Sequence, residues 1–201
     1  MKKTLLGLAL MLGTQAVVAE EIEKNQGWSF GANLAVVNLD SKVAAQEGVD
    51  DAAWSIDASA IYTKDHWVTS LGLGYLGYDD NREFTQRVEG DGWFNDGDIS
   101  TESSDAGAVT GYVATGYEWK FGADQDLTVL AQVGYTHLFS SERSIDYCRN
   151  CYSEDIDIDG GVYAKVAATK DMGPITLGVF VQQYLSGDID NAFGLQLTTQ
   201  F

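Results

Sequence analysis

The sequence predicts an all-β fold, an eight-stranded antiparallel up-and-down transmembrane β-barrel. Apolar residues recur at every second position in eight separate stretches, which is the period of a strand and not of a helix. The apolar stripes run for about ten residues, the length that a tilted strand needs to cross the hydrocarbon of a bilayer. Aromatic residues tend to stand at the ends of these stripes, as they do at the two interfaces of a membrane barrel.

The predicted strands are 28–37, 54–63, 67–76, 108–119, 127–139, 161–170, 175–185 and the closing stretch 191–201. In the second of them, Trp54, Ile56 and Tyr62 share one face, and Ser55 and Asp57 share the other. A soluble barrel or sandwich would turn the apolar face inward, whereas a membrane barrel turns it toward lipid. The length of the stripes, their aromatic ends and the lengths of the connections favour the membrane barrel.

The connections between these strands differ in length. They are short at 64–66, 120–126, 171–174 and 186–190, and long and acidic near 38–53, 79–106 and 140–160. Since outer-membrane barrels have short periplasmic turns and longer outer loops, this pattern places both mature termini in the periplasm. The expected periplasmic girdle is Trp28, Tyr62, Trp67, Tyr117, Trp119 and Phe201, and the expected outer one is Trp54, Tyr75, Phe139 and Phe193.

The start of the chain has the order of a secretory signal peptide. Lys2 and Lys3 precede an apolar run over 5–12, and small residues lead up to Ala19. We expect residues 1–19 to be cleaved, which leaves 20–201 as one outer-membrane β-barrel domain. The apolar run is too short to remain as a membrane anchor.

The composition narrows the function classes. The 201 residues include 30 acidic and 12 basic side chains, a net charge of -18. Such acidity argues against nucleic-acid binding, which needs basic surface to displace counterions. Aromatic residues make up 11% of the chain and the apolar period is clear, so the acidity does not indicate disorder.

The closing stretch NAFGLQLTTQF resembles the C-terminal signature of Gram-negative outer-membrane β-barrels. With about eight strands, the chain is similar to the small OmpA/OmpX-like barrels. That resemblance implies recognition of the last strand by the barrel assembly machinery, through an assembly signal at Phe193, Leu195, Leu197, Thr199 and Phe201. Thr199 is less apolar than the family pattern prefers.

The interior of an eight-stranded barrel is filled by its own side chains. The predicted inward residues are mostly large and polar, so we expect a hydrogen-bonded plug with water pockets. The charged ones include Asp57, Glu118 and Lys165, and Lys165 is the one clear inward cation in mid-strand. We predict that Asp57 and Lys165 approach each other across the lumen. A direct ion pair and separate partners both remain open.

Two short motifs lie in the third long connection. Cys148 and Cys151, in an exported protein, predict a local disulfide at a loop tip, with redox and metal sites as the alternatives for this spacing. The following SEDIDIDGG matches the first half of a calcium loop, but Val166 stands where a bidentate Glu is needed. We therefore predict no specific metal site and no cofactor. Divalent cations could still associate with the acidic loops near lipopolysaccharide phosphates.

The sequence favours a monomeric, non-enzymatic protein of the cell outer membrane that serves envelope integrity, surface interaction or both. Trp93 and Phe94, in the longest loop, are the expected contact residues. A lipid A-modifying enzyme is the first alternative, with His137 as its candidate. Phe139 interrupts the His-x-Ser spacing of barrel deacylases, however, and His66 lies in a periplasmic turn. A narrow channel is the second alternative.

Overall fold

The computed structural model describes residues 26–90, 97, 99–122, 126–145 and 151–200. The predicted signal peptide lies outside these residues, and its cleavage stays a prediction. The elements are β1 (Gln26–Leu39), α2 (Ser41–Glu47), β2 (Val49–Lys64), β3 (Trp67–Asp80), β4 (Thr85–Glu89), β5 (Ile99–Ser103), β6 (Asp105–Phe121), β7 (Leu127–Ser144), β8 (Ser153–Asp155), β9 (Val162–Asp171), β10 (Ile175–Tyr184) and β11 (Ile189–Gln200).

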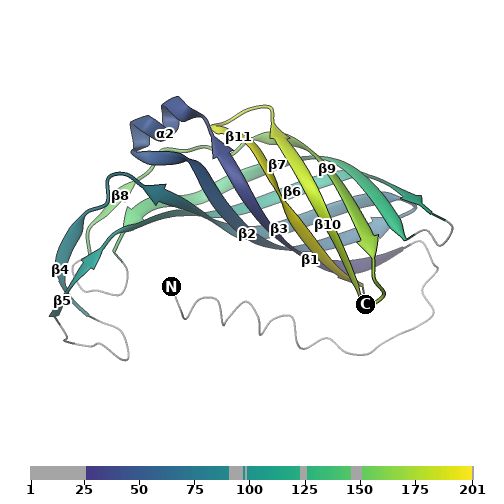
Figure 1. Cartoon of the computed structure of the whole chain (residues 1–201), viewed down its shortest axis with the longest axis horizontal. Coiled ribbons are helices and arrows are strands. Elements are labelled where there is room, and N and C mark those ends of the chain that lie inside the picture. The colour runs from purple at the N-terminus through teal and green to yellow at the C-terminus, as the bar shows by residue number, and fades with distance from the viewer. Residues whose placement is uncertain (1–25, 91–96, 98, 123–125, 146–150, 201) are drawn as a thin grey trace.

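Eight of these strands form a closed antiparallel barrel, which confirms the predicted fold class. Their order is β6-β3-β2-β1-β11-β10-β9-β7, and pairing of β6 with β7 closes the ring. β8 adds three residues to the outer part of β7, while β4 and β5 form a separate two-stranded ribbon. α2, β8 and the ribbon all lie at the barrel end opposite the C-terminus (Figure 1). No helix among the described residues is long and apolar enough to cross a membrane.

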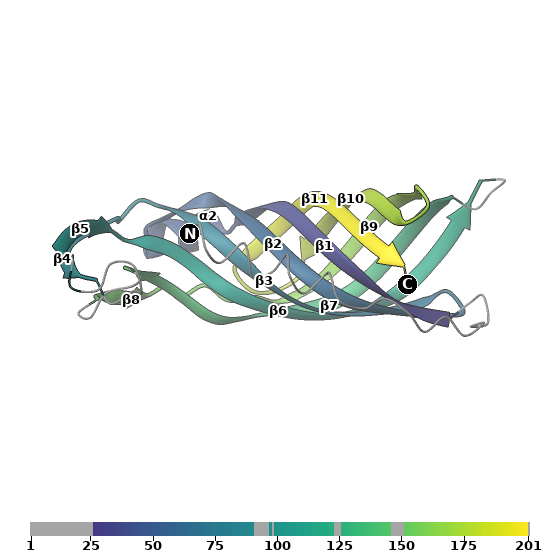
Figure 2. The same cartoon turned by 90° about the horizontal axis from the view of Figure 1, so that it is seen from below.

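The pairing register fixes the slant of the strands. Starting at Trp28 on β1 and stepping from partner to partner around the ring returns to β1 at Asn38, ten residues further on. For eight strands this shear corresponds to a tilt of about 40° from the barrel axis. The oblique course of the strands is visible in Figure 2. A row of paired residues therefore climbs along the barrel as it passes from strand to strand.

The two poles of the barrel differ in the connections that join their strands. Asp65 and His66, with φ of 49° and 72°, make the tight turn between β2 and β3, which is the geometry of a type I′ hairpin. At the other pole the connections predicted as long loops contain regular structure. They hold α2, the ribbon, and strand extensions such as β2 from Val49 and β7 up to Ser144. The strands thus continue past the length that a bilayer requires.

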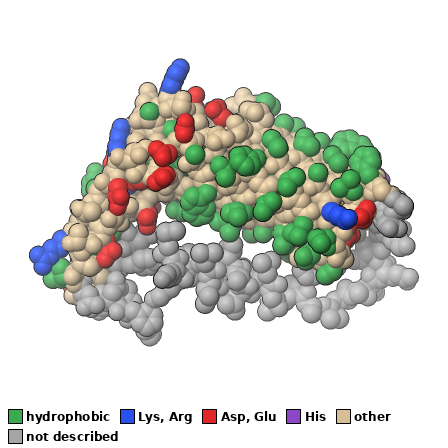
Figure 3. Space-filling view, viewed as in Figure 1, with side chains coloured by type: hydrophobic (Ala, Val, Ile, Leu, Met, Phe, Trp, Pro, Cys, Tyr) green, Lys and Arg blue, Asp and Glu red, His purple; other side chains and the backbone are tan. Residues whose placement is uncertain are grey.

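The outward face carries a belt of exposed apolar side chains. Leu71 and Leu195 are 66% and 60% exposed, although both lie in mid-strand. Ring contacts at the two ends of the belt join Trp28 to Tyr62, Trp67 to Tyr117 and Trp54 to Tyr75. Hydrophobic side chains gather over the barrel in Figure 3, and acidic ones gather toward the pole that carries α2. Monomeric soluble proteins rarely expose an apolar surface this extensive to water.

The interior is layered along the barrel axis. Buried Val68 and Leu130 lie near the short-turn pole, and polar side chains fill the middle. At the outer pole an apolar layer closes the barrel, formed by Val37, Leu39, Leu76, Tyr78, Ala106, Ala108 and Ile189. The polar plug expected from the sequence therefore fills the middle of the barrel, and an apolar layer lies above it. At this pole the inward positions form a core like that of a soluble protein, because the outer connections cover them.

Candidate functional site: the lumen and the outer cap

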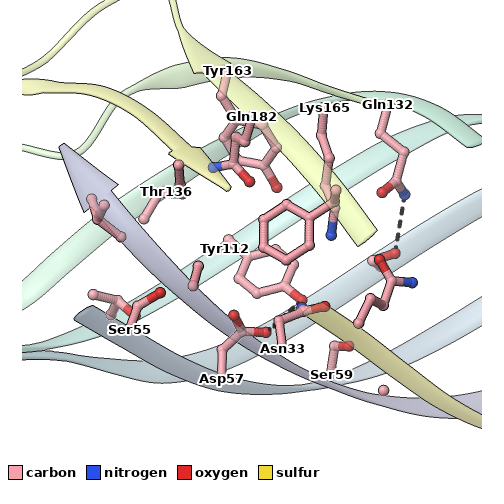
Figure 4. Close-up of a pocket in the computed structure, with 18 of the residues that line it drawn as sticks. Asn33, Ser55, Asp57, Ser59, Tyr112, Gln132, Thr136, Tyr163, Lys165 and Gln182 are labelled. Carbon is pink, nitrogen blue, oxygen red and sulfur yellow. Dashed lines mark hydrogen bonds between the residues drawn. The ribbon is translucent and has the colours of Figure 1, made fainter. Parts of the chain in front are cut away.

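The middle of the lumen is organised around Asp57 on β2. Its Oδ1 accepts hydrogen bonds from Asn33 Nδ2 at 2.7 Å and from the Tyr112 hydroxyl at 3.2 Å. Gln132 on β7 donates to the Ser70 hydroxyl at 3.2 Å. Figure 4 shows the side chains of Asp57, Asn33 and Gln132 pointing from opposite walls into one cavity. The bonds from Asn33 on β1 and Tyr112 on β6 hold the Asp57 carboxylate in place, and the bond from Gln132 separately joins β7 to β3.

Lys165 enters the same cavity from β9 but makes no ion pair with Asp57. Its ammonium lies 4.2 Å from the centroid of the Phe180 ring, a cation–π contact, and the residue is 8% exposed. Both charges line one cavity, as Figure 4 shows. The predicted approach across the lumen thus brings the two residues into one chamber without a direct pair among the described residues. Asp57 takes its hydrogen bonds from Asn33 and Tyr112 instead.

Glu118, the third predicted interior charge, lies apart from this chamber. Its carboxylate forms a 3.4 Å ion pair with Lys120, and its backbone N–H donates to the carbonyl of His66 in the tight turn. With 14% of its side chain exposed, Glu118 belongs to the short-turn mouth of the barrel. It does not line the central cavity.

The central cavity has a volume of about 70 Å³. Two buried side-chain oxygens, Asn33 Oδ1 and Gln196 Oε1, accept no hydrogen bond from the described residues. Several water molecules fit a polar cavity of this size and would satisfy such oxygens. Glycines make room for the large rings: a Cβ at Gly72 would meet the Tyr112 ring, and a Cβ at Gly134 the Tyr163 ring.

The second structured region is the outer cap, which we define as α2, the outer ends of β2, β3 and β7, and residues 153–159. Arg143 on β7 is fully buried there. It donates to Asp80 on β3 at 2.6 Å and to the carbonyls of Glu47 and Gly48, at the end of α2, at 3.1 and 3.3 Å. Glu154 on β8 adds an ion pair at 3.5 Å. The hydrogen bond to Asp80 raises the pKa of Arg143 above its ordinary value.

Sequence reasoning missed Arg143, because residues 140–160 read as one polar loop. Two local signals do mark α2. Asp40 caps its N-terminus, accepting from the backbone N–H groups of Lys42 and Val43, and Gly48 ends it with φ 71°. The hydrogen bonds from Val43 and Lys42 lower the pKa of the Asp40 carboxyl.

The acidic segment after β8 packs as part of the cap. Ile156 and Ile158 are both 4% exposed and belong to the same buried cluster as the outer apolar layer, while the alternating Asp155, Asp157 and Asp159 are exposed. The Asp157 amide donates to the Glu47 carboxylate at 3.0 Å, and the Asp159 amide donates to Asp188 at 2.8 Å. Within the described residues, no group of three or more His, Cys, Asp or Glu side chains is placed to hold a metal ion.

The remaining predicted residues fall in three places. His137 is exposed on the outward face of β7, where the centroid of its ring lies 5.0 Å from that of the Phe139 ring. Four assembly-signal residues, Phe193, Leu195, Leu197 and Thr199, lie on the outward face of β11, paired with β1 and β10. Phe201, Trp93, Phe94 and Cys148 lie outside the described residues, so the disulfide with Cys151 and the loop contact stay predictions.

Comparison with known proteins shows the fold. No model of a known protein family matches the sequence, and no curated protein matches it. The crystal structure of Neisserial surface protein A matches with a TM-score of 0.51, over 89% of this chain and 100% of that chain, at 10% identity. Identity this low speaks for architecture and not for activity. The chain therefore folds as a closed eight-stranded β-barrel similar to Neisserial surface protein A, which confirms the predicted small-barrel architecture.

Proposed function

We propose that the protein is a non-enzymatic outer-membrane barrel that acts through its outer surface, in envelope integrity and surface interaction. Its strands would cross the bilayer between the two aromatic groups, with the cap outside and the mature termini in the periplasm. The belt of exposed apolar side chains carries this proposal, because only acyl chains match such a surface around a closed barrel.

The closed interior supports a structural role over a channel. The polar chamber is small, and the outer layer around Leu39, Leu76 and Ile189 packs to 2–4% exposure. Ile156 and Ile158 come from outside the barrel wall and complete this layer. An ion that entered from the outer pole would have to cross packed apolar side chains without its hydration shell, at a high cost in free energy.

The surroundings of His137 give no support to lipid A chemistry. A hydrolase needs a nucleophile and a base within hydrogen-bond reach of each other. His137 has an aromatic neighbour, Phe139, and lies on the outward wall. We therefore assign His137 to the boundary between the hydrocarbon and the head groups of the bilayer.

The ribbon is the part of the molecule best placed for contact with a partner. It extends beyond the barrel in both views, and β5 is exposed along its whole length (Figures 1 and 2). Phe84, just before the ribbon, packs edge-on against Tyr152, with 5.1 Å between the ring centroids. Gln86 on β4 accepts a hydrogen bond from the Tyr152 amide at 3.1 Å. These contacts with Tyr152, next to β8, support a ribbon held in a fixed direction. Trp93 and Phe94 belong to the connection between β4 and β5.

Deletion of residues 85–103, bridged by a short glycine-serine linker, tests this assignment. The barrel should still fold, because β4 and β5 pair only with each other in the described sheets. We expect intact folding, unchanged permeability and lipid A composition, and loss of binding of whole cells to surfaces or host proteins. Altered lipid A in the deletion strain, or planar-bilayer conductance by the intact protein, would contradict the proposal.

A further inference from the structure

An apolar groove crosses the outward face of five neighbouring strands, β9, β10, β11, β1 and β2. It runs between two rows of paired side chains. The lower row leads from Ala168 on β9 to Leu34 on β1, and the upper row leads from Val166 on β9 to Trp54 on β2. The groove has a volume of about 780 Å³, and Gly194 is among the residues of its floor.

The dimensions of the groove suit a single hydrocarbon chain. Outward rows stand two residues apart along a strand, about 6.6 Å, and five strands span about 19 Å. One leaflet of a bilayer contributes about 15 Å of hydrocarbon. A second copy of the barrel would present a convex wall, which cannot enter a groove one row wide. A stable protein interface also buries about 800 Å² on each partner, which is more than a groove one row wide and about 19 Å long offers.

The direction of the groove points to the outer leaflet. Because rows climb with the shear, the upper row rises from Val166 toward Trp54, whose ring contacts Tyr75 at the outer edge of the belt. The next row above carries three amides, Gln183, Asn191 and Asn38, which are direct cross-strand partners. Asn38 Nδ2 donates to Asn191 Oδ1 at 2.7 Å. Amides at this edge suit the ester carbonyl of a lipid whose chain lies in the groove below.

We propose that this groove binds one acyl chain of an outer-leaflet lipid, with the ester end beside Asn38 and Trp54. The inference rests on the proposed function, since this face meets lipid only if the barrel is embedded in a membrane. The bound chain is more tightly held than the lipid around the rest of the barrel, because side chains contact it from both sides and from the floor.

Fluorescence quenching by a brominated lipid tests this site. One reporter protein keeps Trp54 and has the other four tryptophans replaced by phenylalanine. The second has all five replaced and carries Tyr135→Trp, an outward position on β7 that is 48% exposed. Both are titrated in detergent micelles with dibrominated phosphatidylcholine. We expect half-quenching of Trp54 at about a tenfold lower lipid concentration, equivalent to about 1.4 kcal/mol.

Matched substitutions locate the chain. Ala168→Phe fills the lower end of the groove and should remove the tenfold difference, whereas Ala131→Phe, outward on β7, should preserve it. Equal quenching of the two reporters, or a difference that survives Ala168→Phe, would overturn the site. A dimer dissociated by Ala168→Phe alone would assign the groove to a second copy instead. If neither reporter is quenched in vesicles made wholly of brominated lipid, the proposed function itself fails.

Discussion

Arg143 Nε donates a 2.6 Å hydrogen bond to Asp80 Oδ2, and this contact joins β7 to β3 beyond the apolar belt. The Arg143 side chain is 1% exposed and that of Asp80 is 8% exposed, so the pair is shielded from water. The same guanidinium holds the end of α2 through two carbonyls. The outer cap is therefore tied to the barrel at one buried cation.

Replacing Arg143 should loosen the cap while leaving the barrel folded. Arg143→Met leaves the Asp80 carboxylate buried without its partner, which costs about 3 kcal/mol. We expect proteolysis within the cap at protease concentrations that spare the wild type, with unchanged heat-modifiable migration of the barrel. The double variant Arg143→Met, Asp80→Leu should regain much of the resistance. Global unfolding of the single variant would show that the cap and the barrel are not separable.

Gly72 should be intolerant of even one methyl group. A Cβ at this position would meet the Tyr112 ring, which would move away from Asp57 and break the hydrogen bond between them. We expect Gly72→Ala to lower the free energy of unfolding by about 1–3 kcal/mol, the usual range for overpacking. Urea titration of the protein in vesicles measures this. Gly27→Ala is the matched control, because a Cβ there would meet no atom within 4 Å, and its stability should stay near that of the wild type.

Asp57 and Lys165 should be coupled through the lumen without touching. Either Asp57→Asn or Lys165→Met leaves a buried charge with no opposite charge in the chamber, so each should be destabilising by about 3 kcal/mol. The double variant should lose at least about 1 kcal/mol less than the sum of the two. Asp57→Asn combined with Lys120→Met, at the short-turn mouth, should be additive. Additivity in the Asp57 and Lys165 cycle as well would mean that the two charges do not interact.

Acid should fray α2 before it affects the barrel. The pKa of Asp40 is lowered by the backbone N–H groups of Val43 and Lys42, so its cap stabilises the folded form above the unfolded carboxyl pKa of about 3.9 and loses this effect as the pH falls through the lowered folded value. The protection factors of the Lys42 and Val43 amides, taken relative to intrinsic exchange at each pH, should fall in that range. Asp40→Asn should show protection that does not change across it. Equal pH dependence in both proteins would remove Asp40 as the cause.

The barrel could be predicted from the sequence because its two faces carry opposite kinds of side chain. Apolar residues outside and polar residues inside impose a strict period of two, so the parity of Asp57, Lys165 and Leu195 follows directly from position in the strand. Glycines such as Gly72 also carry a readable signal, since a narrow lumen that holds tyrosines needs neighbours without side chains.

The cap could not be predicted, because it depends on contacts between distant segments. Arg143 contacts Asp80, Glu47 and Glu154, which are far apart in sequence and fall in stretches that read as acidic loops. Burial of Ile156 likewise follows from the closure of the barrel beneath it, which local alternation does not reveal. The absence of a direct Asp57–Lys165 pair depends on the choice between Asn33, Tyr112 and Phe180 as neighbours, and parity does not decide that choice.

Spin labels on four consecutive residues of β1 test the central claim most directly. Asn33, Leu34, Ala35 and Val36 are replaced one at a time by a labelled cysteine, with Cys148 and Cys151 changed to serine, and the protein is reconstituted in vesicles. If acyl chains touch the apolar face, oxygen dissolved in the bilayer should relax the labels at 34 and 36 and leave those at 33 and 35 shielded. Shielding at 34 and 36, with water-soluble reagents reaching 33 and 35, would contradict it.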